Sequence, residues 1–120
     1  MREPLRLEFD KESLAREYED FHIAAYAGNE LVGILLLKPG LQKEIIKMRQ
    51  VAVHDEWQGK GVGKEMVKFS EEFAYRKGFK KIELNARDTA VKFYGSLGYT
   101  IQGEMFYEVG IPHKKMYKIL

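Results

Sequence analysis

The chain has 120 residues, 45% of them apolar and 32% charged, and its net charge at pH 7 is +2. This length and composition fit a single globular domain spanning 1–120 and exclude an intrinsically disordered chain. The sequence has no cysteine, which excludes disulfides, a thiol nucleophile and thiolate metal ligands, and no apolar run approaches the ~18 residues of a membrane span. We therefore expect a cytoplasmic protein with no metal site and no membrane partner.

The first twenty residues show two patterns. Leu5–Phe9 alternates apolar and polar side chains as a short strand does, and Leu14–Asp20 fits one or two helical turns. Pro4 and the charged run Asp10–Glu12 are more typical of a loop. The residues alone leave both interpretations open.

Three strands are predicted next. Phe21–Ala27 and Leu31–Lys38 are apolar runs separated by Gly28-Asn29-Glu30. Because Gly and Asn tolerate positive φ, this spacing predicts a β-hairpin. Glu44–Val53, rich in Ile and Val, predicts a third strand that leads into a glycine cluster.

A helix follows the glycines. Val62, Met66, Phe69 and Phe73 recur at helical spacing and define an apolar face, and Gly78 is placed to end the helix. The pattern therefore predicts an amphipathic helix packed on a sheet.

The C-terminal third predicts further strands around a second helix. Lys81–Leu84 is a short strand, and Asp88 is placed to cap a helix that ends at Gly98. Tyr99–Gln102 and Lys114–Leu120 read as the last strands, joined by a loop that contains Pro112. The order β-β-β-α-β-α-β-β indicates an α/β or α+β fold, with a mixed, mostly antiparallel sheet and helices on both faces.

The glycine cluster has the features of an anion-binding loop. Gln58–Lys64 contains three glycines and two lysines between a strand and a helix. The first turn of a helix has unpaired N–H groups, and glycine lets a phosphate approach the backbone closely. A ligand-free turn is the other interpretation, which the entropic cost of three glycines in five residues disfavours.

Two common phosphate-binding patterns do not fit this loop. A Walker A loop needs a glycine where the chain has Gln58 and a Ser or Thr where it has Glu65. A dinucleotide fingerprint needs a last glycine where the chain has Lys64 or Met66. The pattern that does fit is Gln-x-x-Gly-x-Gly.

In that pattern the segment Val51–Gly63 resembles the acetyl-CoA-binding motif of the GNAT superfamily of N-acetyltransferases. In that family the strand ends in a splayed bulge whose backbone pairs with the pantetheine arm, a role that would fall on Val51 and Val53. The following loop wraps the pyrophosphate. The resemblance assigns that role to seven residues: Gln58, Gly59, Lys60, Gly61, Val62, Gly63 and Lys64.

A second block is similar to the family's other cofactor motif. It comprises Leu84–Arg87, Ala90–Tyr94 and Leu97–Tyr99. The resemblance implies that Asn85 bonds the cofactor and that Tyr94 lies near its sulfur, where an ordinary phenol stays protonated at neutral pH and can protonate the leaving thiolate as general acid. Core packing is the alternative for Tyr94.

The general base is less defined. Many family members carry a glutamate on the strand before the glycine loop, where this chain has Met48, Arg49 and Gln50. Glu108 and His113 are the candidates for proton removal or acceptor contact, although a solvated glutamate and a structural histidine are the alternatives. Gly110–His113 is similar to a Gly-Ile-Pro-His segment of a subgroup of small prokaryotic members.

The resemblance implies an enzyme that moves the acetyl group of acetyl-CoA to a primary amine on a small molecule or a protein. A non-catalytic acetyl-CoA sensor is the alternative, because the usual glutamate is missing. Nucleic acid is not an expected partner, since Lys and Glu are interspersed without a basic stripe. Only twenty residues precede Phe21, so we expect the family's N-terminal helices to be shortened or missing and its first strand to be absent, leaving apolar surface that favours a homodimer.

Overall fold

The computed structural model describes residues 5–10, 20–40 and 42–120, and of residues 5–10 the backbone alone. The described elements are β1 (Leu5–Asp10), β2 (Phe21–Ala27), β3 (Glu30–Pro39), β4 (Ile45–Val53), α1 (Val62–Arg76), β5 (Lys81–Arg87), α2 (Val91–Ser96), β6 (Thr100–Ile101), β7 (Phe106–Glu108) and β8 (Ile111–Ile119). Short 3₁₀ turns at Asp55–Trp57 and Asp88–Ala90 follow β4 and β5.

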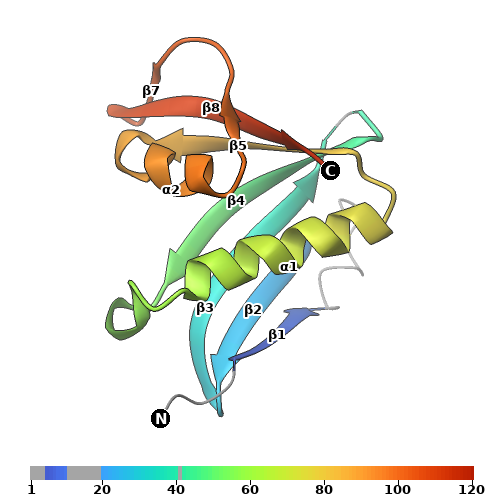
Figure 1. Ribbon diagram of the computed structural model, residues 1–120, viewed down its shortest axis with the longest axis vertical. Helices are drawn as coiled ribbons and strands as arrows, with labels where there is room; N and C mark the ends of the chain where they lie inside the picture. The colour runs from blue at the N-terminus through green and yellow to red at the C-terminus, as the bar shows by residue number, and fades with distance from the viewer. Residues whose placement is uncertain (1–4, 11–19, 41) are drawn as a thin grey trace.

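The strands form one mixed sheet, in the order β1-β2-β3-β4-β5-β8-β6, with β7 paired to β8 (Figure 1). Every neighbouring pair is antiparallel except β4 and β5, which α1 connects as a crossover. The mixed, mostly antiparallel sheet is the one expected. Two strands are observed in addition to the predicted order: β1 at the N-terminus and β7 near the C-terminus.

The N-terminal strand is present. β1 pairs with β2 along its whole length, from Leu5 opposite Ala27 to Asp10 opposite His22. The prediction that this strand is missing is therefore wrong, and the alternative, a first strand at Leu5–Phe9, is confirmed. An alternating pattern outweighs a charged run here because an edge strand can expose its charges to water. The predicted helical turns at Leu14–Asp20 lie, up to residue 19, outside the described residues.

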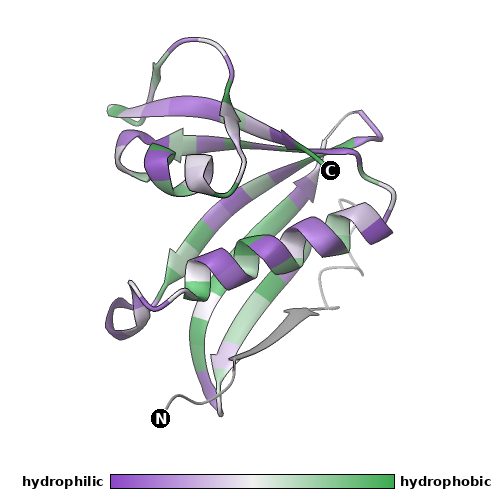
Figure 2. Ribbon diagram, in the orientation of Figure 1, coloured by the Kyte–Doolittle hydropathy of each residue, from purple (hydrophilic) through white to green (hydrophobic). Residues whose placement is uncertain are grey.

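The core lies between α1 and one face of the sheet (Figure 2). Val62 and Met66 of α1 are buried and Phe69 and Phe73 partly buried, as predicted for its apolar face, and Val67 is buried as well. Gly33 of β3 is what lets the helix come this close, because a Cβ there would lie 2.9 Å from Met66 Cε. No helix in the described part of the chain has the length and hydropathy to cross a membrane.

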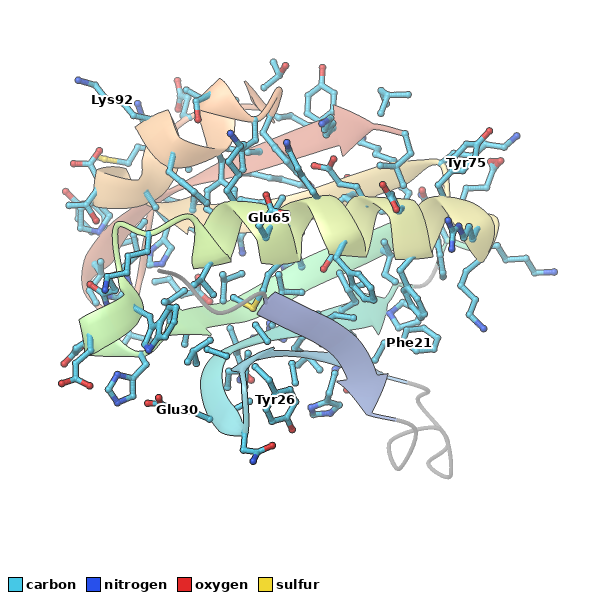
Figure 3. The ribbon with its side chains drawn as sticks, turned by 60° about the horizontal axis from the view of Figure 1, so that its bottom comes forward. Phe21, Tyr26, Glu30, Glu65, Tyr75 and Lys92 are labelled. Atoms are coloured by element: carbon cyan, nitrogen blue, oxygen red, sulfur yellow. The ribbon has the colours of Figure 1, made fainter. Side chains whose placement is uncertain are left out.

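The two ends of α1 are anchored differently. Phe21 lies towards its C-terminal end (Figure 3), where its ring packs edge-on against Phe73 with 5.0 Å between centroids. Gly78, at φ 97°, ends the helix as predicted. At the N-terminal end the chain enters from the glycine loop, and Phe93 of α2 lies beside Gly63.

α2 lies on the same face of the sheet as α1. Lys118 of β8 joins the two, because its Nζ donates to Glu71 Oε1 of α1 at 3.0 Å and to the carbonyl of Leu97, just after α2, at 2.8 Å. The opposite face carries no helix among residues 5–10, 20–40 and 42–120. The helix expected on that face is therefore not part of the described chain.

Two local predictions near the C-terminus are wrong. Asp88 does not cap α2, because it starts a 3₁₀ turn and no side chain bonds the first turn of the helix. Pro112 does not lie in a loop but in β8, opposite Tyr107 of β7. Proline is tolerated there because it lies next to the start of the strand. Val109 and Gly110, at φ 53° and 74°, form the turn of this β7–β8 hairpin.

Candidate active site

The parallel strands β4 and β5 separate halfway along their length. They pair from Ile45 opposite Lys81 to Met48 opposite Leu84, and then diverge. On the other side, the register between β3 and β4 shifts between Ile34 and Leu36, and Gln50 takes φ 54°. A bulge of this kind bends its strand and increases its twist. It turns the rest of β4 away from β5 and leaves that edge of β4 without a strand partner in the described chain.

A cavity of about 740 Å³ fills the gap. Residues 47–53 of β4 and 84–87 of β5 form its walls. The β7–β8 hairpin, α2 and the turns after β4 and β5 complete it, with Gln58, Ala90, Tyr94, Glu108, Val109, Ile111 and His113. Seven predicted site residues therefore meet in one cavity: Val51, Val53, Gln58, Asn85, Tyr94, Glu108 and His113.

The glycine loop lies at the C-terminal end of β4. Gln58 holds it there, because its Nε2 donates to the carbonyl of Val53 at 3.2 Å and to Asp55 Oδ1 at 3.3 Å. Gly59 and Gly61 have φ of 76° and 88°, with no neighbouring atom within 4 Å of a Cβ placed on either. Gly61 is the N-cap of α1 and provides no side-chain bond to the first turn. This geometry leaves N–H groups open to an anion.

The other residues of the loop are either packed against the core or charged. Val62 is buried, so only its backbone can face a ligand. Gly63 lies where a Cβ would meet Phe93 Cζ at 3.4 Å. Lys64 is exposed, and the Lys60 ammonium lies over the Trp57 ring, 5.3 Å from its centroid. Gly59–Lys64 do not line the cavity itself, but form the loop and first turn beyond Gln58.

Tyr94 is buried and lines the cavity from α2. Its ring packs edge-on against Phe93 and Tyr99, with centroids 5.0 Å and 5.8 Å away. Burial raises the pKa of Tyr94 to about 12, so its hydroxyl stays protonated at neutral pH. The position supports both packing and proton donation.

His113 is held in one orientation by two contacts. Its Nδ1 lies 2.8 Å from the carbonyl of Ile111, and its ring stacks on Phe106 with 5.9 Å between centroids. Because a carbonyl only accepts, Nδ1 carries the proton, and neutral imidazole then has its lone pair on Nε2. Glu108 Oε1 lies 3.8 Å from that Nε2. An imidazolium formed at His113 would therefore have a carboxylate beside it.

The sequence prediction missed the basic wall of the cavity. Lys47 and Arg49 line it from β4, and their alternation with buried Ile46 and Met48 was the available signal. It also missed Val109, at the tip of the hairpin, whose exposed fraction is the highest among the large apolar side chains that the structure describes. No sequence pattern predicts a positive φ for a β-branched residue.

Comparison with known proteins agrees with this architecture. The model of the acetyltransferase (GNAT) domain family matches residues 6–120. The chain belongs to this family. This confirms the expected enzyme class, an acetyl-CoA-dependent N-acetyltransferase.

Individual relatives support the assignment. The uncharacterized N-acetyltransferase YjcF of Bacillus subtilis is 34% identical over 105 residues, which cover 85% of this chain and 72% of that protein. A putative N-acetyltransferase from Lactobacillus plantarum has a TM-score of 0.85 at 19% identity, covering 97% and 98% of the two chains. A Bacillus subtilis acetyltransferase in complex with CoA has a TM-score of 0.79 at 23% identity, covering 98% and 99%. The likeness to these two structures establishes the fold.

Proposed function

We propose that this GNAT acetyltransferase moves the acetyl group of acetyl-CoA directly to a primary amine in the cavity between β4 and β5. The observation that carries the proposal is the splay of these strands. It places an unpaired strand edge, an open helix N-terminus, a protonated tyrosine and an oriented histidine around one space. This combination suits a long, partly anionic thioester.

The cofactor would lie along β4. The N–H groups at the start of α1, with Lys60 and Lys64 beside them, suit its pyrophosphate. The free edge of β4 at Val51 and Val53 suits the amide groups of the pantetheine arm, which would pair with it as an added strand. Asn85 faces the same space from β5. The thioester would then reach the bulge at Gln50.

Each remaining group has one step in the transfer. Nε2 of His113 takes a proton from the ammonium of the acceptor, and Glu108 stabilises the resulting imidazolium. The free amine attacks the thioester carbonyl, and a backbone N–H near Val51 stabilises the developing oxyanion. The C–S bond then breaks, and Tyr94 donates its proton to the thiolate. The proton that the new amide nitrogen releases to solvent balances the one that Tyr94 takes back. Burial disfavours the charged thiolate as it disfavours the charged phenolate. It therefore raises the pKa of the CoA thiol and reduces the difference between that pKa and the pKa of Tyr94.

The Gly-Ile-Pro-His segment and the dimer belong to the same proposal. Gly110–His113 runs from the hairpin turn into β8 and positions His113 in the cavity lining, so the segment would have a catalytic role. Tyr107 and Val109 of the hairpin are 67% and 94% exposed. We take this apolar rim as the surface on which a second copy docks, beside the acceptor entrance.

The test is acetyl-CoA binding followed by turnover. Excess acetyl-CoA, at a hundred times Kd, should stabilise the fold by about 2.7 kcal/mol. Gly61→Glu should abolish this stabilisation by acetyl-CoA, because the new carboxylate would face the pyrophosphate. Gly78→Glu is the matched control: it has a similar φ of 97° and equally open surroundings, but lies at the other end of α1.

Thiol release measured with an amine panel completes the experiment. Release that depends on the amine supports transfer. A wild-type chain that acetyl-CoA does not stabilise contradicts the whole proposal. Stabilisation without turnover of any amine contradicts the transferase and leaves a binding module.

A further inference from the structure

Two basic side chains without a counter-charge lie at the closed end of the cavity, where β4 and β5 still pair. Lys47 and Arg49 line the cavity from β4, and neither forms an ion pair or hydrogen bond with any residue that the structure describes. Because they alternate with Ile46 and Met48, which are buried under α1, both point to the opposite, helix-free face. They are therefore available to a ligand.

The acid opposite Lys47 is already engaged. Glu83 is the register partner of Lys47 across the β4–β5 pair. Its carboxylate lies 3.2 Å from Lys81 Nζ and 3.6 Å from Lys115 Nζ. Lys38, the register partner of Lys47 on β3, adds another positive charge to this face. The closed end of the cavity is thus locally cationic in a chain whose net charge is only +2.

The phosphates of the cofactor do not account for these charges. Arg49 and Val53 are four residues apart, which corresponds to roughly 13 Å of extended strand, and the glycine loop begins beyond Val53. That loop has its own lysines, Lys60 and Lys64. A pantetheine arm that follows β4 back to the bulge is uncharged, so Lys47 and Arg49 lie past the reacting thioester, on the acceptor's side.

The carboxylate of the cavity lining lies on its other side. Glu108 and His113 line the cavity from the β7–β8 hairpin, across β5 from Lys47 and Arg49. Arg87 of β5, the register partner of His113, also lines it. We propose that the acceptor is a zwitterionic small molecule, whose ammonium group faces Glu108 and His113 while its carboxylate or phosphate is bound by Arg49 and Lys47. This inference rests on the proposed acetyl transfer.

Matched amines test the inference. For each chain length from two to six carbons, kcat/KM is compared among an ω-amino acid, the n-alkylamine and the α,ω-diamine. Ethanolamine and phosphoethanolamine form a separate pair that distinguishes phosphate from carboxylate. We expect the anionic member of the best set to exceed the neutral one by about ten- to a hundredfold, the diamine to be the poorest, and the preference to shrink at high salt.

Variants assign the preference to its residues. Arg49→Ala and Lys47→Ala should each lower the ratio of anionic to neutral kcat/KM, while turnover of the n-alkylamine and stabilisation by acetyl-CoA persist. Arg49→Lys should restore part of the ratio, and Lys68→Ala, on the exposed side of α1, should leave it unchanged. A preference for neutral amines or diamines, or a ratio that both alanine variants leave intact, overturns the inference. A wild-type protein that turns over none of these amines, or that does not bind acetyl-CoA, would overturn the proposed function instead.

Discussion

Tyr94 combines a packing position with a chemical one. It belongs to the core cluster and also lines the cavity. Because the folded pKa of about 12 lies above the ordinary value of 10, the buried neutral phenol stabilises the fold below pH 10. That contribution is lost as the pH rises from 10 towards 12, well outside the range in which the enzyme would work.

Tyr94→Phe should lower kcat by about 10²–10⁴-fold and leave the affinity for acetyl-CoA nearly unchanged, because the hydroxyl acts only on the leaving thiolate. Steady-state kinetics and cofactor titration measure the two effects. Tyr99→Phe is the control, since this neighbouring tyrosine is also buried but does not line the cavity. A wild-type rate for Tyr94→Phe with a good acceptor would reduce Tyr94 to packing.

Among the elements, β8 is joined to both helices through one side chain. Lys118 ties α1 and α2 to β8, and its methylene chain lies against Gly98, where a Cβ would be 3.3 Å from Lys118 Cε. Glu71, its partner, is largely buried. Burial and the Glu71 carboxylate also raise the pKa of Tyr99 above its ordinary value. A buried carboxylate here requires its cation.

Lys118→Ala should therefore lower the free energy of unfolding by about 2–4 kcal/mol, because the largely buried Glu71 side chain loses its partner. Urea denaturation measures the change. Lys80→Ala breaks an exposed pair with Glu44, at 3.3 Å, and should cost less than about 1 kcal/mol. Equal losses in the two variants would show that Lys118 has no special role.

Elements with a strong local pattern could be predicted from the sequence. β2, β3 and α1 follow from alternation, a Gly-Asn turn and helical spacing, and the glycine loop follows from its composition. Gln50 and Val109 could not be predicted, because each takes a positive φ that its residue type avoids, one at the bulge of β4 and the other in the β7–β8 turn. β7 was missed for a related reason: three residues that pair only across a tight turn carry too little periodicity.

At the scale of the whole molecule, the apolar rim of the hairpin predicts a dimer. Light scattering should give twice the 14.0 kDa of one chain at high protein concentration. Tyr107→Lys combined with Val109→Lys should return the monomer by placing charge in the interface. Tyr75→Lys, equally exposed at 67% but at the C-terminal end of α1 (Figure 3), should not. A monomeric wild type at high concentration would contradict the proposal.

The short parallel junction divides the sheet into two leaves. β1 to β4 with α1 form one leaf, and β5 to β8 with α2 form the other. Within the described sheet four residue pairs between β4 and β5 join them, and on the helix side Lys118 of β8 bonds Glu71 of α1. Acetyl-CoA lying in that seam would pair with the free edge of β4 and extend the junction towards its open end. The substrate would then supply hydrogen bonds that the sheet lacks between β4 and β5. The free chain should then open along this seam first, and amide protection on either side of it should report occupancy by the cofactor even where no side chain touches it.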